Sequence, residues 1–252
     1  MPFSLETPVA SVSGFRRRFS IEPDELSIRV AVEDDFHCMK LFIEHKDGVA
    51  QTVTAEIIRA PWTTCPGAQQ KATETFIGQS LTDFDRLGSK KQNCTHLYDL
   101  ALLAGNHYIA ASSFIYDILI SDPDETGLSL GEVHRDGELL LRWHVRSFVV
   151  ELPEEAMKGR LDRLTPWIES LESELKEPAK LLRWAFMIAH GRTIPMADQS
   201  DATAMPPNCY TFQPERAVTA VRIGEIIDFS VENLEPLAAL VIANDNENKS
   251  TR

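Results

Sequence analysis

The sequence lacks the short motifs that usually reveal nucleotide binding or a catalytic zinc ion. It contains no G-x-G-x-x-G, no G-x-x-x-x-G-K-[ST] and no H-E-x-x-H. The first two motifs cradle phosphates on glycine-rich loops, and the third places two histidine ligands on one helix face. Their absence argues against nucleotide hydrolysis and against redox chemistry on a Rossmann dinucleotide.

Cysteine and long apolar runs are also scarce. Only four cysteines occur in 252 residues, and residues 1–14 lack the basic and then apolar stretch of a secretory signal. The longest apolar stretch, 97–114, is interrupted by Asp99, Asn106 and His107, and it falls short of the roughly 20 apolar residues that cross a bilayer. We therefore expect a soluble, cytoplasmic protein with reduced thiols rather than a disulfide framework.

Positive charge is in deficit, with 25 Lys and Arg against 38 Asp and Glu, a net charge of −13 and a pI near 5.0. A diffuse acidic surface repels phosphate backbones, so nucleic acid and anionic membranes are not expected partners. The one dense basic run, Arg16-Arg17-Arg18, is too short to change this. The expected partner is a small hydrophobic substrate, and the sequence is compatible with a homodimer.

Alternating apolar and polar residues predict four strands in the first sixty residues, at 15–21, 26–32, 38–44 and 50–58. Asp47-Gly48 favours a tight hairpin because these residues tolerate positive φ. After these strands the periodicity becomes helical and predicts helices over 65–76 and 95–112. The first half is therefore predicted to be an antiparallel β-meander packed against helices.

The second half repeats the order of strands and then helices. We expect a strand at 115–120, a hairpin at Asp136-Gly137 that leads into 138–151, helices over 166–175 and 178–189, and a short strand at 209–212. The predicted fold class is α+β.

The predicted organisation has two parts between flexible tails. Residues 12–114 carry the meander and two helices, and residues 115–243 form the second half. The sequence is compatible both with two separate domains and with one continuous sheet. Residues 1–11 and 244–252 are the expected tails.

Cys65 and Cys94 each stand where a helix is predicted to begin. Unpaired backbone amides and the helix dipole stabilise a thiolate there, so we expect the pKa of each thiol to be lowered. His96 follows Cys94 by two residues, and Asp99 lies one helical turn beyond it, where it could fix the imidazole tautomer. Cys65, Cys94 and His96 are thus candidate ligands for a single Zn or Fe ion, with a cofactor-free site as the alternative.

A second polar cluster, Asp34-Asp35-Phe36-His37, precedes a predicted strand. We expect His96 or His37 to act as the acid or base, with Asp34 or Asp99 orienting it. Trp62 and Tyr98 are candidates for stacking on a substrate ring, and Tyr210 and Arg216 for lining a pocket in which Arg216 meets a carboxylate.

Several of these segments resemble the bacterial family described as domain of unknown function 2889. The resemblance covers nearly the whole chain, and its most specific part is Cys94-Thr95-His96-Leu97. The other segments that carry it are Asp34-Asp35-Phe36-His37, residues 61–68, residues 181–192 and residues 209–217. Relatives of this form are associated with bacterial breakdown of aromatic ring compounds, so the resemblance implies such a setting.

The first half also resembles iron–sulfur scaffold and sulfur-acceptor (SufE-like) proteins. In these folds a β-meander is followed by helices whose first residues are cysteines that converge at one end of the sheet. The likeness implies that Cys65 and Cys94 lie together, although Asp47-Gly48 supplies no third cysteine.

These observations lead to three hypotheses. The first is a lyase that cleaves a carbon–carbon bond, by decarboxylation or deformylation, in a hydrophobic aromatic compound; such steps need an acid or base and an apolar pocket but no nucleotide. The alternative is a metal or sulfur carrier built on Cys65, Cys94 and His96. A structural role with packed, inert thiols is the third possibility.

Overall fold

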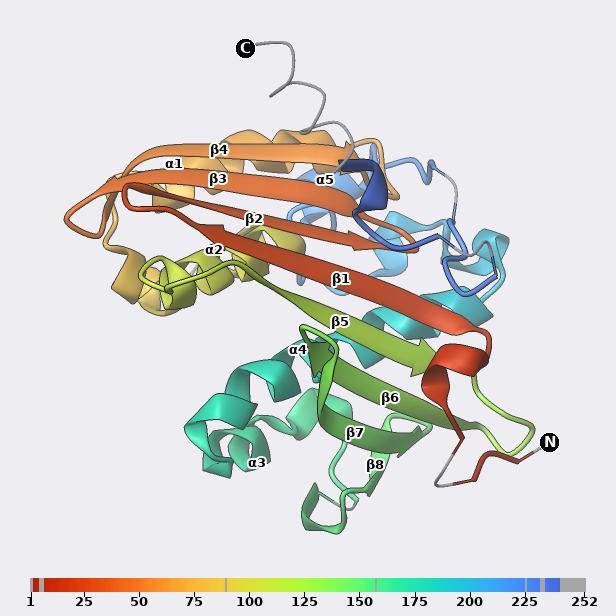
Figure 1. The fold of residues 1–252 in the computed structure, drawn as a ribbon. Coiled ribbons are helices and arrows are strands. Elements are labelled where there is room, and N and C mark those ends of the chain that lie inside the picture. Colours follow the sequence, from red (N-terminus) through yellow and green to blue (C-terminus); the bar gives the residue numbers. More distant parts are fainter. Residues whose placement is uncertain are drawn as a thin grey trace. The chain divides into compact units, whose positions relative to one another are not determined.

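The structure is a computed structural model that describes residues 2–4, 7–88, 90–156, 158–224, 226–231 and 234–240. Its strands form one sheet in the order β4-β3-β2-β1-β5-β6-β7-β8 (Figure 1). The strands are β1 (Gly14–Pro23), β2 (Ser27–Asp34), β3 (Cys38–Lys46), β4 (Val49–Arg59), β5 (Phe114–Ser121), β6 (Leu128–Arg135), β7 (Glu138–Arg146) and β8 (Val149–Leu152). The strand pairs β2–β3–β4 and β5–β6–β7–β8 are antiparallel. The predicted α+β class with an antiparallel meander is confirmed.

The chain divides into two compact units that are not single stretches of sequence. Unit 1 comprises Met1–Arg18, Tyr116–Pro195 and Asp228–Glu235. Unit 2 comprises Phe19–Ile115, Met196–Ile227 and the described residues from Pro236 onward. Of the two expected tails, 244–252 lies outside the described residues, whereas Val9–Ser11 forms a short 3₁₀ helix with Val9 fully buried.

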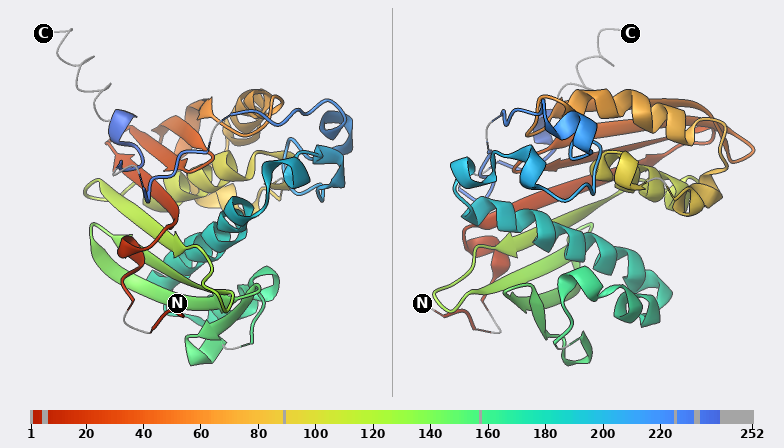
Figure 2. Two further views of the ribbon diagram at one scale, coloured as in Figure 1. Left: turned by 90° about the vertical axis from the view of Figure 1, so that its right-hand side faces the viewer. Right: turned by 180° about the vertical axis from the view of Figure 1, so that it is seen from behind.

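Unit 2 contains the β2–β4 meander with α1 (Ala68–Phe76) and α2 (Thr95–His107). α1 packs on β4, and α2 packs on β2 and β3. Both helices lie on the same face of these strands, the one turned toward the viewer in the right-hand view of Figure 2. The hairpin between β3 and β4 turns at Asp47 and Gly48, whose φ values of 52° and 73° agree with the predicted tight turn. α2 ends at His107, earlier than predicted, after the weak helix formers Gly105 and Asn106.

Unit 1 contains β5–β8 with α3 (Thr165–Ser170) and α4 (Ser173–Ala189). α4 packs on β6 and β7, and Gly131 of β6 leaves room for the Phe186 ring, which a Cβ would meet at 2.4 Å. The predicted helix start at Pro178 is wrong, because Pro178 lies inside α4. Burial of the apolar face of α4 offsets the hydrogen bond that proline cannot donate.

The predicted strand at 209–212 does not form: turns occupy these residues, and α5 (Pro214–Ala217) follows them. Within the described ranges, no helix combines the length and the apolar composition that crossing a membrane would require.

Candidate functional site

Asp34 and His37 form the turn that joins β2 to β3. Oδ1 of Asp34 accepts the backbone N–H groups of Phe36 and His37, both at 2.8 Å, and lies 3.0 Å from Nδ1 of the His37 ring. An aspartate that accepts backbone N–H groups two and three residues ahead closes a tight turn. Local sequence therefore brings this carboxylate and this imidazole together.

Arg59, the last residue of β4, holds this turn from the neighbouring strand. Its Nη1 donates to the carbonyl of Asp35 at 2.8 Å, and its Nη2 donates to the carbonyl of Asp34 at 2.6 Å and to Glu33 Oε1 at 3.0 Å. A planar guanidinium can serve several acceptors at once, which an ammonium cannot do with the same geometry. The sequence did not indicate this role, because only strand register places Arg59 opposite Cys38.

His96 joins the pair from the first turn of α2. Its ring stacks on that of His37, with centroids 3.9 Å apart and planes 30° apart, and its Nε2 lies 4.0 Å from Oδ2 of Asp34. Asp34 is fully buried, and the two histidines are 7–8% exposed. One ligand atom from each residue lies within 4.8 Å of the other two, so this group could hold a metal ion.

Asp99 lies apart from this group although it shares α2 with His96. Its carboxylate forms an ion pair with the ammonium of Lys90. The carboxylate that faces His96 is that of Asp34, from another segment of the chain.

Cys94 is the N-cap residue of α2, and its sulfur contacts Sδ of Met39 at 3.8 Å. Burial raises the pKa of the Cys94 thiol well above its usual value, and the nearby Cys65 thiol raises it further. The backbone N–H groups of Leu97 and His96 oppose this rise but are outweighed. The predicted lowering of this pKa is wrong, because removing a thiolate from water costs more than the helix terminus returns.

Cys65 opens a short 3₁₀ helix, Cys65–Gly67, and its sulfur lies 3.4 Å from Oγ1 of Thr211. Burial also raises the pKa of the Cys65 thiol, so the expected lowering is wrong here too. Cys65 and Cys209 both lie near enough to Cys94 to raise its pKa, which agrees with the expected proximity of the first two thiols. However, the only compact group of three potential ligands found among the described residues is Asp34, His37 and His96, so Cys65 and Cys94 do not complete a ligand set with His96.

The aromatic candidates occupy packed positions. Trp62 is buried in a small cluster with Ala202 and Ala217, and Phe212 meets its ring edge-on at 5.7 Å. The buried Tyr98 donates its hydroxyl hydrogen to the carbonyl of Phe84 at 3.0 Å. Neither ring is an open stacking surface.

Tyr210 and Arg216 interact with each other. The Arg216 guanidinium lies 3.9 Å from the centre of the Tyr210 ring and pairs with Glu215. The Tyr210 hydroxyl lies against Gly67, where a Cβ would approach it to 2.6 Å. This arrangement fixes both side chains beside the short helix that begins at Cys65.

No family model matches the chain, and no curated protein matches it. The resemblance to the family described as domain of unknown function 2889 therefore stays a prediction.

Two imidazoles and one carboxylate form a ligand set of intermediate hardness. Such a set suits Zn²⁺ and Fe²⁺ and occurs in catalytic zinc sites and in non-haem iron sites. Without a metal ion, the Asp34–His37 contact still resembles the pairing by which a carboxylate fixes the tautomer of a catalytic imidazole. Both uses require the turn that Arg59 braces.

Proposed function

We propose that this protein is a small-molecule enzyme whose reaction centre is Asp34, His37 and His96 with a bound divalent transition-metal ion, Zn²⁺ or Fe²⁺. The observation that supports the proposal is the buried convergence of two imidazoles and one carboxylate from two separate segments. Imidazole nitrogens and carboxylate oxygens are the groups that commonly bind these two ions in proteins.

The spacing of the three residues is compatible with a bound metal ion. Oδ1 of Asp34 already faces three donors in the turn, whereas Oδ2 faces Nε2 of His96 across 4.0 Å. That separation is too long for a hydrogen bond. Asp34, His37 and His96 would each supply one ligand atom to such an ion, and the remaining coordination position would be open to substrate or water.

The reaction that fits this centre is carbon–carbon bond cleavage in a hydrophobic aromatic compound in the cytoplasm. In a decarboxylation the bond to the carboxylate breaks, its electron pair stays on the ring-bearing carbon, carbon dioxide leaves and one proton is taken up. A bound divalent ion would stabilise the negative charge that develops on a coordinated oxygen. The absence of nucleotide-binding motifs is consistent with this reaction, which needs no nucleotide.

The first test is metal content. The purified protein should hold close to one Zn or Fe per chain, and Asp34→Asn and His96→Ala should each lose it. His107→Ala is the matched control, because His107 lies on the same helix but packs on Phe114, and this variant should keep its metal. Absence of stoichiometric metal after reconstitution with Zn²⁺ and with anaerobic Fe²⁺ would refute the metal centre.

The second test is turnover on a panel of aromatic acids and lignin-type aromatic dimers. Activity that His96→Ala abolishes and His107→Ala retains would support the lyase. Activity that survives complete removal of metal would instead assign the chemistry to the Asp34–His37 pair as acid and base.

A metal-binding protein without turnover is the second candidate. The near-complete burial of all three residues favours it, because a buried ion is well suited to a stabilising role. Stoichiometric metal without activity on the panel, together with a large loss of thermal stability on chelation, would support this candidate.

A further inference from the structure

Unit 1 contains a cavity of about 230 Å³ that shares no lining residue with the Asp34–His37–His96 group. β5, β6 and β7 line one side of it, and the end of α4 and the following 3₁₀ helix, His190–Thr193, line another. The apolar side chains that line it are those of Ile120, Val145, Phe148, Leu161, Phe186 and Ala189. An apolar cavity of about 150 Å³ accommodates benzene, so this one has room for a larger ring system.

Polar groups line the same cavity at a few positions. They include the hydroxyl groups of Ser129, Ser147 and Thr193, the carboxylate of Asp122 and the exposed imidazole of His190. The His190 ring meets that of Phe148 edge-on at 4.7 Å, so an aromatic and a polar group stand together. Apolar walls with a few polar groups are typical of sites for small organic molecules.

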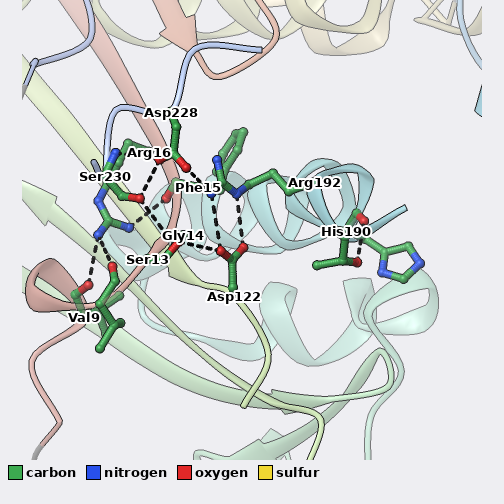
Figure 3. Close-up of polar contacts among 12 residues, drawn as sticks. Val9, Ser13, Gly14, Phe15, Arg16, Asp122, His190, Arg192, Asp228 and Ser230 are labelled. Carbon is green, nitrogen blue, oxygen red and sulfur yellow. Dashed lines mark hydrogen bonds and ion pairs between the residues drawn. The ribbon is translucent and has the colours of Figure 1, made fainter. Parts of the chain in front are cut away.

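Asp122, which lines the cavity, shares the guanidinium of Arg192 with Asp228 (Figure 3). Arg192, whose side chain is 8% exposed, contacts Asp122 at 3.1 Å and Asp228 at 2.9 Å. Asp122 also accepts the hydroxyl hydrogen of Ser13 at 2.7 Å. Among the described lining residues Asp122 is the one carboxylate, and neither Lys nor Arg lines the cavity, so an anionic ligand would meet a carboxylate and no cationic side chain.

Ser129 lies in the segment Gly127-Leu128-Ser129-Leu130-Gly131, which has the pattern G-x-S-x-G of serine hydrolases. In those enzymes the serine stands on a sharp turn from a strand to a helix. Here Ser129 lies within β6 and pairs with Val145 of β7, so its backbone is that of an ordinary strand. The cavity therefore has the features of a binding site rather than of a nucleophile elbow.

We propose that this cavity binds a small, uncharged ring compound that carries a hydroxyl group and that it rejects the corresponding carboxylate. The ring packs between Phe148, Phe186 and the aliphatic walls, and the hydroxyl group exchanges hydrogen bonds with the serine and threonine hydroxyls. A carboxylate in the same position would meet the carboxylate of Asp122 and no cationic lining side chain.

The probes are 2-naphthol and 2-naphthoate, which share one ring system and differ in charge. The full chain should bind 2-naphthol with a Kd below about 1 mM and bind 2-naphthoate at least about tenfold more weakly, as measured by calorimetry or NMR titration. Equal or tighter binding of 2-naphthoate would overturn the proposal, and so would the absence of 2-naphthol binding.

The location of binding is tested with Ser129→Phe, which fills the cavity. This variant should lose 2-naphthol binding, whereas Ser113→Phe, at an exposed position in unit 2, should retain it. Retained binding in a folded Ser129→Phe variant would contradict the proposal. If Ser129→Phe does not fold, NMR of the unaltered protein provides the test. The ring resonances of His190, assigned by their absence in His190→Gln, should shift when 2-naphthol is added. Unchanged His190 resonances would overturn the proposal.

Discussion

Replacing Asp34 by alanine should destabilise unit 2 strongly, because this fully buried carboxylate organises the turn between β2 and β3. Oδ1 of Asp34 accepts two backbone N–H groups at 2.8 Å and lies 3.0 Å from the His37 ring nitrogen. The substitution leaves two buried N–H donors without that acceptor, at about 1–3 kcal/mol each. We expect the free energy of unfolding to fall by about 2–5 kcal/mol, a large part of the typical total of about 5–15 kcal/mol.

Asp34→Asn separates the turn from the charge. An asparagine keeps a carbonyl oxygen that can accept both backbone N–H groups, so the turn survives while the negative charge that faces His37 and His96 is lost. We expect a loss of about 1–2 kcal/mol, clearly less than for alanine. Asp99→Ala is a suitable control, because its ion pair with Lys90 is partly exposed and such pairs contribute about 0–1 kcal/mol.

The assay is urea unfolding at pH 7 in the presence of a chelator, followed by circular dichroism and tryptophan fluorescence. The chelator removes any contribution from bound metal, which would otherwise add stability to the unaltered protein only. If the two signals give separate transitions, each one is fitted by itself. Equal stability of Asp34→Ala and Asp34→Asn, or a loss below about 1 kcal/mol for Asp34→Ala, would refute this account of the turn.

Three further predictions concern other parts of the chain. Arg59→Lys should lower stability by about 1–3 kcal/mol in urea unfolding, because an ammonium cannot serve the several carbonyl groups that the guanidinium serves, and an unchanged midpoint would contradict this. Thiol titration at pH 8 should be slow in the folded protein and should give four thiols after unfolding. Burial raises the pKa of Cys38 to about 12, with a further contribution from the charge of Glu33, and burial raises the pKa of Cys209 to about 11, so neither thiol ionises readily. Rapid reaction of these two thiols in the folded protein would contradict the prediction. Burial raises the pKa of Asp228, but hydrogen bonds and the charge of Arg192 outweigh this and lower the pKa overall. Asp228→Asn should therefore be less stable than the unaltered protein above about pH 4, and the difference should vanish as the pH falls through the lowered pKa; a difference that grows toward acid pH would show the sign to be wrong.

Features that depend on neighbouring residues were predictable. The strands of the meander and the hairpin at Asp47-Gly48 follow from period-two alternation and from residues that tolerate positive φ. The polar cluster at Asp34–His37 was visible in the sequence, and its geometry is that of a local turn. Its acid or base role stays a prediction. The helix beginning after Cys94 was also foreseen, because its apolar positions recur with helical spacing.

Features that depend on burial were predicted incorrectly. The helix starts at Cys65 and Cys94 suggested lowered thiol pKa values, yet both are raised, because the sequence does not reveal how much water the fold removes from each sulfur. The helix break expected at Pro178 is absent because the apolar face of α4 is buried against β6 and β7. The strand expected at 209–212 is replaced by turns.

The sequence by itself determined the local geometry: the alternation of strands, the hairpin turns and the turn that sets Asp34 beside His37. Only the tertiary structure decided which carboxylate faces His96 and that Arg59 braces the turn. Helical spacing pointed to Asp99, which instead pairs with Lys90. The physical reason is that backbone conformation and side-chain spacing are local quantities, whereas the meeting of side chains from distant segments depends on how sheet and helix pack to bury their apolar faces.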